Sequence, residues 1–206
     1  MEKSEREDVY SRDEYYWGTE PSTLAERTAD MLPEQLDGHR LIDLGAGEGR
    51  DAVFFAKRGA DVTAVEISPA GLEKARRLAA NHGVSITTVH ADANELRFTE
   101  SFDIVFSSGA VQFIRPDIRA RQFARFKEAT TPGGLHAIFA FVDHPDVPPA
   151  PDTTDDQYLF ERDELQSYYE TWETVASEEI IFADDSGGVP HKHAARVHFA
   201  RAPESH

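Results

Sequence analysis

From residue 39 onward, short apolar segments alternate with longer segments of helical periodicity. Between the apolar segments, hydrophobic residues recur at three- and four-residue spacing, which predicts helices that end near Gly59, near Gly83 and near Thr130. Strands that alternate with helices in this way are typical of a parallel sheet with crossover helices. The segments that we predict as strands are 40–44, 61–66, 85–90, 102–106 and 135–142.

The helix after the second predicted strand has the clearest ends. Ser68 stands before Pro69, and Gly83 follows the last apolar residue of the periodic segment. Serine is a favoured N-cap, proline fits the first helical position, and glycine commonly follows the last helical turn. The sequence therefore predicts a helix that begins at Pro69 and ends before Gly83.

Both ends of the chain differ from this alternating core. Residues 1–37 are polar with scattered aromatic side chains, and we interpret them as an N-terminal helical cap segment, with a helix from about residue 22 to 32. Residues 38–206 then form the ligand-binding domain of a single-domain protein, as the length of 206 residues permits.

The C-terminal part is predicted to complete the sheet. Residues 143–157 are rich in proline and aspartate, which predicts an exposed loop or a lid. A helix over 162–169 and two strands over 173–182 and 193–201 follow, the strands joined by a reversal at 184–188. The fold class is thus α/β, with a mostly parallel seven-stranded sheet flanked by helices and an antiparallel last strand.

A glycine-rich turn follows the first predicted strand. Gly45, Gly47 and Gly49 let backbone N–H groups and a helix N-terminus approach a ligand, although a tight strand-to-helix turn alone could also explain them. Glu66 ends the next strand roughly 20 residues later, where a carboxylate can accept hydrogen bonds from ribose hydroxyls. Together these residues predict a nucleoside ligand. Arg50 occupies the position at which a dinucleotide fingerprint has glycine, which disfavours a nicotinamide cofactor.

The segment Asp43 to Gly49, with the sequence DLGAGEG, resembles the first motif of class I S-adenosylmethionine-dependent methyltransferases. Later motifs of that family follow in order, with Asp92 after the third strand, 102–105 in the fourth strand, and Pro-Gly-Gly at 132–134. The resemblance implies a Rossmann-like fold and S-adenosyl-L-methionine as the cofactor. The cofactor-binding residues that it implies are Asp43, Gly45, Ala46, Gly47, Glu66, Ile67, Asp92, Ala93 and Ser108.

Outside this core, residues 15–18 and 164–172 are similar to small methyltransferases of the tellurite-resistance type, a group close to thiopurine methyltransferases. This resemblance implies a small-molecule acceptor, such as a thiol, a chalcogen oxyanion or another small nucleophile. Histidine and arginine near the last strands take part in catalysis in that group, but the residues here do not align without a shift. The catalytic candidates are therefore His191, His193 and Arg196.

The substrate side is predicted to lie beyond Ser108, near Phe113, with Tyr16 and Trp17 closing above it. Ser-Ser-Gly-Ala at 107–110 lacks the Pro-Pro-aromatic motif of methyltransferases that act on amino groups of DNA bases or of protein glutamine. His191 and His193 alternate on a strand and share a face, but with no third ligand in view we expect no metal.

The net negative charge of the chain limits the kinds of molecule that it can bind. The net charge of −17 disfavours nucleic acid, because capture of a phosphate backbone depends on clustered basic residues. No apolar run is long enough for a membrane span, and the acidic N-terminus does not resemble a secretory signal, so we expect a cytoplasmic protein that is a monomer or a homodimer. The absence of cysteine excludes disulfides and thiolate chemistry.

Three functions of different classes are compatible with these residues. The first is methyl transfer from S-adenosylmethionine to a small molecule. The second is a nicotinamide-dependent oxidoreductase, and the third is a non-catalytic nucleoside-binding regulator. The glycine turn and Glu66 suit all three, whereas the later motifs favour the methyltransferase.

The acidic composition generates a prediction on salt. Only five of the 21 basic residues are lysines, a pattern that resembles proteins of salt-accumulating halophiles, although an ordinary acidic cytosolic protein is the alternative. Charge repulsion reaches further at low ionic strength, because the Debye length grows from about 3 Å at 1 M to about 30 Å at 0.01 M. We expect the melting temperature to rise clearly between about 0.05 M and about 2 M potassium chloride. Equal melting temperatures would contradict the halophilic interpretation.

Overall fold

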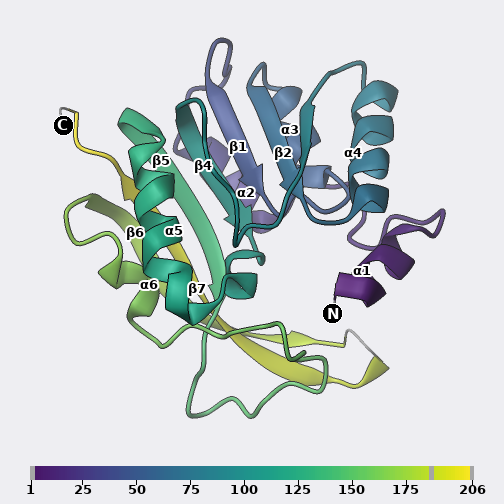
Figure 1. Ribbon diagram of the computed structural model, residues 1–206, viewed down its shortest axis with the longest axis vertical. Helices are drawn as coiled ribbons and strands as arrows, with labels where there is room; N and C mark the ends of the chain where they lie inside the picture. Colours follow the sequence, from purple (N-terminus) through teal and green to yellow (C-terminus); the bar gives the residue numbers. More distant parts are fainter. Residues whose placement is uncertain (1–2, 186–187, 205–206) are drawn as a thin grey trace.

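Seven strands form one sheet in the order β3-β2-β1-β4-β5-β7-β6 in the computed structural model, which describes residues 3–185 and 188–204 (Figure 1). Strands β1 to β5 pair in parallel, and β7 is antiparallel to both of its neighbours. The predicted fold class is confirmed. The strands are β1 (Arg40–Leu44), β2 (Asp61–Glu66), β3 (Thr87–His90), β4 (Phe102–Ser108), β5 (Thr130–Phe141), β6 (Glu173–Asp184) and β7 (His191–Arg201).

Helices cover both faces of the sheet, and β1 shows why. Its residue Leu41 packs with Phe55 on one face, whereas Ile42 packs with Phe123 and Phe126 on the other, so both faces of the strand are apolar. The helices are α1 (Lys3–Tyr10), α2 (Thr23–Asp30), α3 (Arg50–Ala56), α4 (Pro69–Asn81), α5 (Pro116–Glu128) and α6 (Glu164–Ser167), with a short 3-10 helix at Val111–Phe113.

The predicted ends of α4 are confirmed. Ser68 is its N-cap, and the Ser68 hydroxyl accepts a hydrogen bond of 3.0 Å from the backbone N–H of Gly71. Pro69 is the first helical residue, as expected.

Several predicted bounds shift by a few residues, and the junction of α5 and β5 differs most. Helix α5 ends at Glu128, and β5 begins at Thr130 rather than Leu135. The Thr130 hydroxyl lies 2.6 Å from the carbonyl of Phe126 and 2.7 Å from His136 Nε2, which ties the end of the helix to the new strand. Helix α1 was not predicted, because its residues are almost all polar and carry no apolar periodicity.

The β6–β7 hairpin extends beyond the parallel strands at the lower edge of Figure 1, on the side of α1. The segment 143–157 follows β5 on the same side and is largely irregular, in agreement with the predicted loop. In the predicted reversal at 184–188, residues 186–187 lie outside the described residues. Three segments that are remote in sequence thus gather at the carboxyl ends of the parallel strands.

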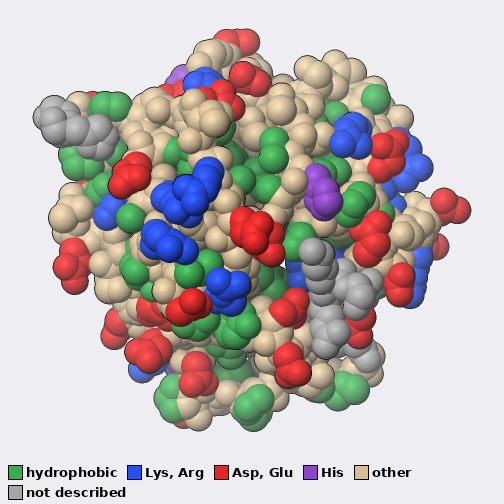
Figure 2. Space-filling model, in the orientation of Figure 1, with side chains coloured by type: hydrophobic (Ala, Val, Ile, Leu, Met, Phe, Trp, Pro, Cys, Tyr) green, Lys and Arg blue, Asp and Glu red, His purple; other side chains and the backbone are tan. Residues whose placement is uncertain are grey.

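Acidic and basic side chains are interspersed on the face that Figure 2 shows, with acidic ones spread over all of it. On that face, the described side chains form no continuous basic patch of the kind that nucleic acid requires. Among the described residues, every helix is too short or too polar to span a bilayer.

A buried histidine on β5 generates a prediction on acid stability. His136 is fully buried, with Nδ1 2.8 Å from the Tyr169 hydroxyl and Nε2 2.7 Å from the Thr130 hydroxyl. Burial lowers the pKa of His136 to about 3. Because an unfolded histidine has a pKa of about 6.5, the unfolded state binds more protons below that pH, and the free energy of unfolding falls as the pH falls from about 6.5 toward 3.

We expect His136 alone to cost about 2 kcal/mol of stability on going from pH 7 to pH 5. Urea unfolding of the wild type and of His136→Gln at both pH values measures this loss, which should be smaller in the variant because glutamine does not titrate. His82→Gln, at an exposed position after α4, is the matched control and should behave like the wild type. Equal pH dependence in His136→Gln and the wild type would contradict the assignment.

Candidate functional site

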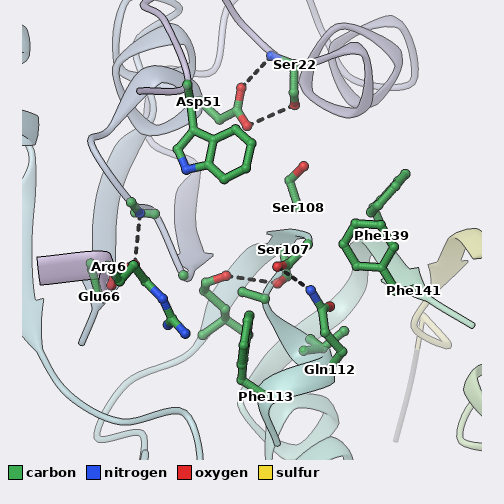
Figure 3. Close-up of a pocket in the computed structure, with 18 of the residues that line it drawn as sticks. Arg6, Ser22, Asp51, Glu66, Ser107, Ser108, Gln112, Phe113, Phe139 and Phe141 are labelled. Carbon is green, nitrogen blue, oxygen red and sulfur yellow. Dashed lines mark hydrogen bonds between the residues drawn. The ribbon is translucent and has the colours of Figure 1, made fainter. Parts of the chain in front are cut away.

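A cavity of about 860 Å³ opens at the carboxyl ends of β1, β2 and β4, within the range of roughly 300–1,000 Å³ typical of small-ligand pockets. The turn after β1 and the ends of β2 and β4 line one part of it, and the N-terminal segment, the loop 151–157 and the β6–β7 hairpin line the rest (Figure 3). Sequence-predicted residues that line this cavity are Asp43, Gly45, Ala46, Gly47, Glu66, Ile67, Asp92, Ala93, Ser108, Tyr16, Trp17, Phe113 and His193.

Glu66 at the end of β2 holds the glycine turn in place. Its Oε2 accepts a hydrogen bond of 3.0 Å from the backbone N–H of Gly47, and its Oε1 accepts one of 3.0 Å from the N–H of Ser68. Gly45 has a φ of +80°, and a Cβ at this position would lie 2.1 Å from the Cβ of Ala110. A carboxylate accepts about four hydrogen bonds, so Glu66 keeps the capacity to accept two more from ribose hydroxyls.

Asp43 at the end of β1 is a buried acid at the same turn. Its Oδ2 has no hydrogen-bond partner among the described residues, and the side chain lines the cavity. Burial, followed by the charges of Asp51 and Glu66, raises the pKa of Asp43 well above its usual value. A cationic ligand in the cavity would relieve this cost, because a nearby opposite charge favours the ionised carboxylate.

Asp92 lies at the far end of this half of the cavity. Its Oδ1 accepts hydrogen bonds of 2.8 Å from both the backbone N–H and the side-chain amide of Asn94. The Asn94 amide also donates to the carbonyl of Phe113, and the Arg6 guanidinium lies 4.2 Å from the centre of the Phe113 ring. The structure thus brings Phe113 beside Asp92, although the sequence placed it on the substrate side.

The N-terminal segment covers the glycine turn. The backbone N–H of Trp17 donates to Glu48 Oε2 at 3.1 Å, and the indole N–H of Trp17 donates to the Tyr10 hydroxyl at 2.8 Å. Arg50 Nη1 donates to the carbonyl of Trp17 at 2.9 Å. Trp17 therefore lies over the turn itself, with its side chain partly exposed.

A buried ion pair under this segment was missed by sequence reasoning. Lys74 Nζ of α4 lies 2.6 Å from Glu48 Oε1, and the two side chains are 3% and 1% exposed. Lys74 also donates to the carbonyl of Glu14, so one lysine joins α4, the glycine turn and the N-terminal segment. The helical periodicity of α4 indicates that Lys74 lies between apolar positions, but it does not show which acid it meets.

Phenylalanine side chains form the wall of the cavity opposite Phe113. Phe139 and Phe141 lie together beyond Gln112 and Ser108 in Figure 3, with ring centres 5.4 Å apart. The Phe141 ring in turn lies 4.8 Å from that of His193. Sequence reasoning missed these phenylalanines, because β5 is apolar on both faces and nothing in the sequence separates cavity-lining residues from core residues.

The three catalytic candidates do not share one environment. His193 lines the cavity, and His191 stands beside it with the two Nε2 atoms 2.9 Å apart. Arg196 lies on the opposite face of β7, where its guanidinium contacts Glu179 at 3.2 Å and the carbonyl of Arg162 at 3.1 Å. Because strand residues alternate between faces, residues 193 and 196 cannot point the same way. Arg196 therefore does not line the cavity together with His193.

Comparison with known proteins agrees with this geometry. Residues 41–134 match the family described as "Methyltransferase domain". The chain is 30% identical to hemagglutinin 1 of Eikenella corrodens over 73% of its own length and 50% of that relative. It is 27% identical to a probable S-adenosyl-L-methionine-dependent methyltransferase, TehB, of Haemophilus influenzae, over 65% of the chain and 46% of the relative. The chain thus spans about half the length of these two proteins.

Solved structures share the fold. TehB from Haemophilus influenzae superimposes with a TM-score of 0.80 at 24% identity, over 96% of this chain and 67% of that one. The 1,6-didemethyltoxoflavin-N1-methyltransferase of Burkholderia thailandensis, solved with S-adenosylhomocysteine, gives a TM-score of 0.66 at 22% identity, over 87% and 76% of the two chains.

Residues 41–134 match a methyltransferase domain, and the chain is similar to class I S-adenosylmethionine-dependent methyltransferases, which supports S-adenosylmethionine as its cofactor. Within that class the chain resembles the TehB group.

The ion pair of Glu48 and Lys74 generates a prediction. Lys74→Met leaves a buried carboxylate without its cation, which costs about 3–5 kcal/mol when one partner of a buried pair is removed. We expect this loss in urea unfolding, together with a change in the fluorescence of Trp17, whose N–H is held by Glu48. Lys74→Met/Glu48→Gln should recover part of the loss, and Lys57→Met, at an exposed lysine, should be near neutral. A neutral Lys74→Met would show that the pair is not a structural link.

Proposed function

We propose that the chain transfers the methyl group of S-adenosylmethionine to a small-molecule nucleophile. The observation that carries the proposal is that a single cavity extends from the acidic glycine turn of the cofactor site to an aromatic wall. This wall has no part in holding the turn, so it is available to a second ligand. Asp43, Glu66 and Asp92 line the first part, and Phe139, Phe141 and His193 line the second. The residues fit the cofactor, because its ammonium and sulfonium groups supply the positive charge that the buried acids lack.

In this proposal, the chain binds the cofactor, orients the acceptor toward it, and excludes water from the site. When bound, the cofactor supplies a methyl group already activated on a positive sulfur. Glu66 would hold the ribose hydroxyls of the nucleoside, and Asp43 would hold the ammonium group. The aromatic wall keeps water away from the acceptor, and alignment of the nucleophile with the methyl group lowers the barrier without a strong base.

We propose a thiol or a chalcogen oxyanion as the acceptor, because the resemblance to the tellurite-resistance group points to such nucleophiles. His193, whose pKa is lowered by burial, lines the acceptor end of the cavity. The apolar wall suits a small, polarisable nucleophile better than a highly charged macromolecule.

We further propose that residues 1–37 act as a cap on a ligand-binding domain formed by residues 38–206. The hydrogen bond from Trp17 to Glu48 supports this division, since Glu48 belongs to the glycine turn. Arg6 also lies 3.6 Å from Asp156, so the segment meets the loop 143–157 across the cavity. Such a cap would seal the cofactor from bulk water.

Calorimetric titration tests the proposal. We expect S-adenosylmethionine and S-adenosylhomocysteine to bind, and Glu66→Ala to weaken both by about 1.5–3 kcal/mol, the scale of hydrogen bonds to a charged group. Asp61→Ala is the matched control, because Asp61 is exposed at the opposite end of the same strand. Methyl transfer is then assayed against thiols, tellurite, selenite, thiopurines and amines. Heat from NADH with none from S-adenosylmethionine would contradict the proposal.

A further inference from the structure

Two histidines and two aspartates converge beside the aromatic wall of the cavity. One ligand atom from each of Asp152, Asp184, His191 and His193 lies within 4.8 Å of the other three. The two histidine Nε2 atoms are 2.9 Å apart, and Asp152 Oδ1 lies 3.2 Å from that of His191 and 3.5 Å from that of His193. Asp184 Oδ2 lies 3.5 Å from His193 Nε2 and 4.0 Å from His191 Nε2.

The hairpin and the loop build this cluster from three places in the chain. Asp184 of β6 pairs directly with His191 of β7, and His193 follows two residues later on the same face. Asp152 comes from the loop 143–157 and closes the cluster from the other side. The histidine side chains are nearly buried, at 8% and 9% exposed, whereas the two aspartates are about one-third exposed. Solvent can therefore reach the carboxylates while the imidazoles stay fixed.

The orientation of His191 is set by the backbone. Its Nδ1 lies 2.6 Å from the carbonyl oxygen of Val189, which can only accept a hydrogen bond. Nδ1 must therefore carry the proton, and in the neutral ring the lone pair is on Nε2, which faces the cluster. Histidines that bind metals are commonly held in this way, with the second ring nitrogen donating to a carbonyl or a carboxylate.

We propose that Asp152, Asp184, His191 and His193 bind one divalent transition-metal ion of the zinc class. Zinc bonds of about 2.0–2.2 Å place the ligand atoms of a tetrahedral site about 3.3–3.6 Å apart. The separations of 3.5 Å from His193 to the two aspartates fit this spacing, 3.2 Å is close to it, and 2.9 and 4.0 Å differ from it by small movements of the side chains. Two imidazoles select zinc-like ions over magnesium or calcium, which prefer oxygen ligands alone. Two carboxylates balance the double charge of the ion.

The site faces the cavity, and its surroundings suit a metal. His193, Asp152 and Asp184 line the cavity, and the rings of Phe141 and Phe182 pack on His193 with centres 4.8 and 5.7 Å away. Tyr16 of the N-terminal segment lines the same cavity. If the proposed methyl transfer is correct, an ion here would add positive charge to the acceptor end of the cavity, while its four protein ligands fill the positions around it.

The test measures metal binding without cofactor. The full chain is freed of metal with a chelator and titrated with zinc chloride by calorimetry, and with cobalt chloride followed by its visible absorption. We expect one zinc ion per chain. Asp152→Asn and His193→Gln should weaken binding by at least the roughly 10–100-fold that loss of an outer partner costs in known metal sites. His82→Gln, at an exposed histidine remote in sequence, should bind like the wild type.

The controls separate the possible failures. Asp152→Asn changes a loop residue outside the hairpin. If His193→Gln fails to fold, Asp152→Asn alone tests whether the cluster binds zinc. Circular dichroism checks that both variants fold. The proposed site would be wrong if the wild type did not bind one zinc ion per chain, or if the cluster variants bound zinc as tightly as His82→Gln. Any zinc binding would then be non-specific binding to surface carboxylates. Titration of the same samples with S-adenosylmethionine tests the proposed function separately, since cofactor binding does not require the cluster.

Discussion

The carboxylate of Glu66 is the contact on which the geometry of the site depends. It joins the end of β2 to the backbone of the glycine turn through Gly47 and to the start of α4 through Ser68. This side chain, together with hydrogen bonds of 2.8 and 2.9 Å from the backbone N–H groups of Gly45 and Ala46 to the carbonyl of Val65, fixes the turn, the helix and the strand relative to one another. The floor of the cavity and the contacts of the N-terminal segment both follow from this arrangement, because Glu48, which binds Trp17, belongs to the same turn.

The second constraint is the sign of the buried charge. Asp43, Glu48, Asp51 and Glu66 are all buried around the turn. Lys74 pairs with Glu48, and Arg50 lies 3.8 Å from Asp51, so the remaining surplus of negative charge lies on Asp43 and Glu66. A cavity with this surplus of negative charge favours a ligand with positive groups and disfavours a pyrophosphate at the turn. The same electrostatics that make S-adenosylmethionine a suitable ligand thus argue against a dinucleotide, independently of the residue at position 50.

The opposite end of the cavity has a different chemical environment. Its imidazoles are nearly buried, its carboxylates are partly exposed, and aromatic rings separate it from the core. The β6–β7 hairpin holds these side chains beyond the ends of the parallel strands. Substitutions in the hairpin are therefore expected to leave the glycine turn and the cofactor part of the cavity intact. The proposed ion and the proposed acceptor both belong to this half, whereas the cofactor depends on the turn.

The sequence by itself determined the features that depend on residues close together in the chain. The strands 40–44 and 61–66, the capped helix from Pro69, the glycine turn and the position of Glu66 at a strand end all follow from local periodicity and capping chemistry. Only the tertiary structure decided which distant side chains meet. Lys74 finds Glu48, and Asp152 joins His193 across the loop and the hairpin. Such contacts depend on how elements pack, and packing between residues far apart in the chain leaves no periodic signal in the sequence.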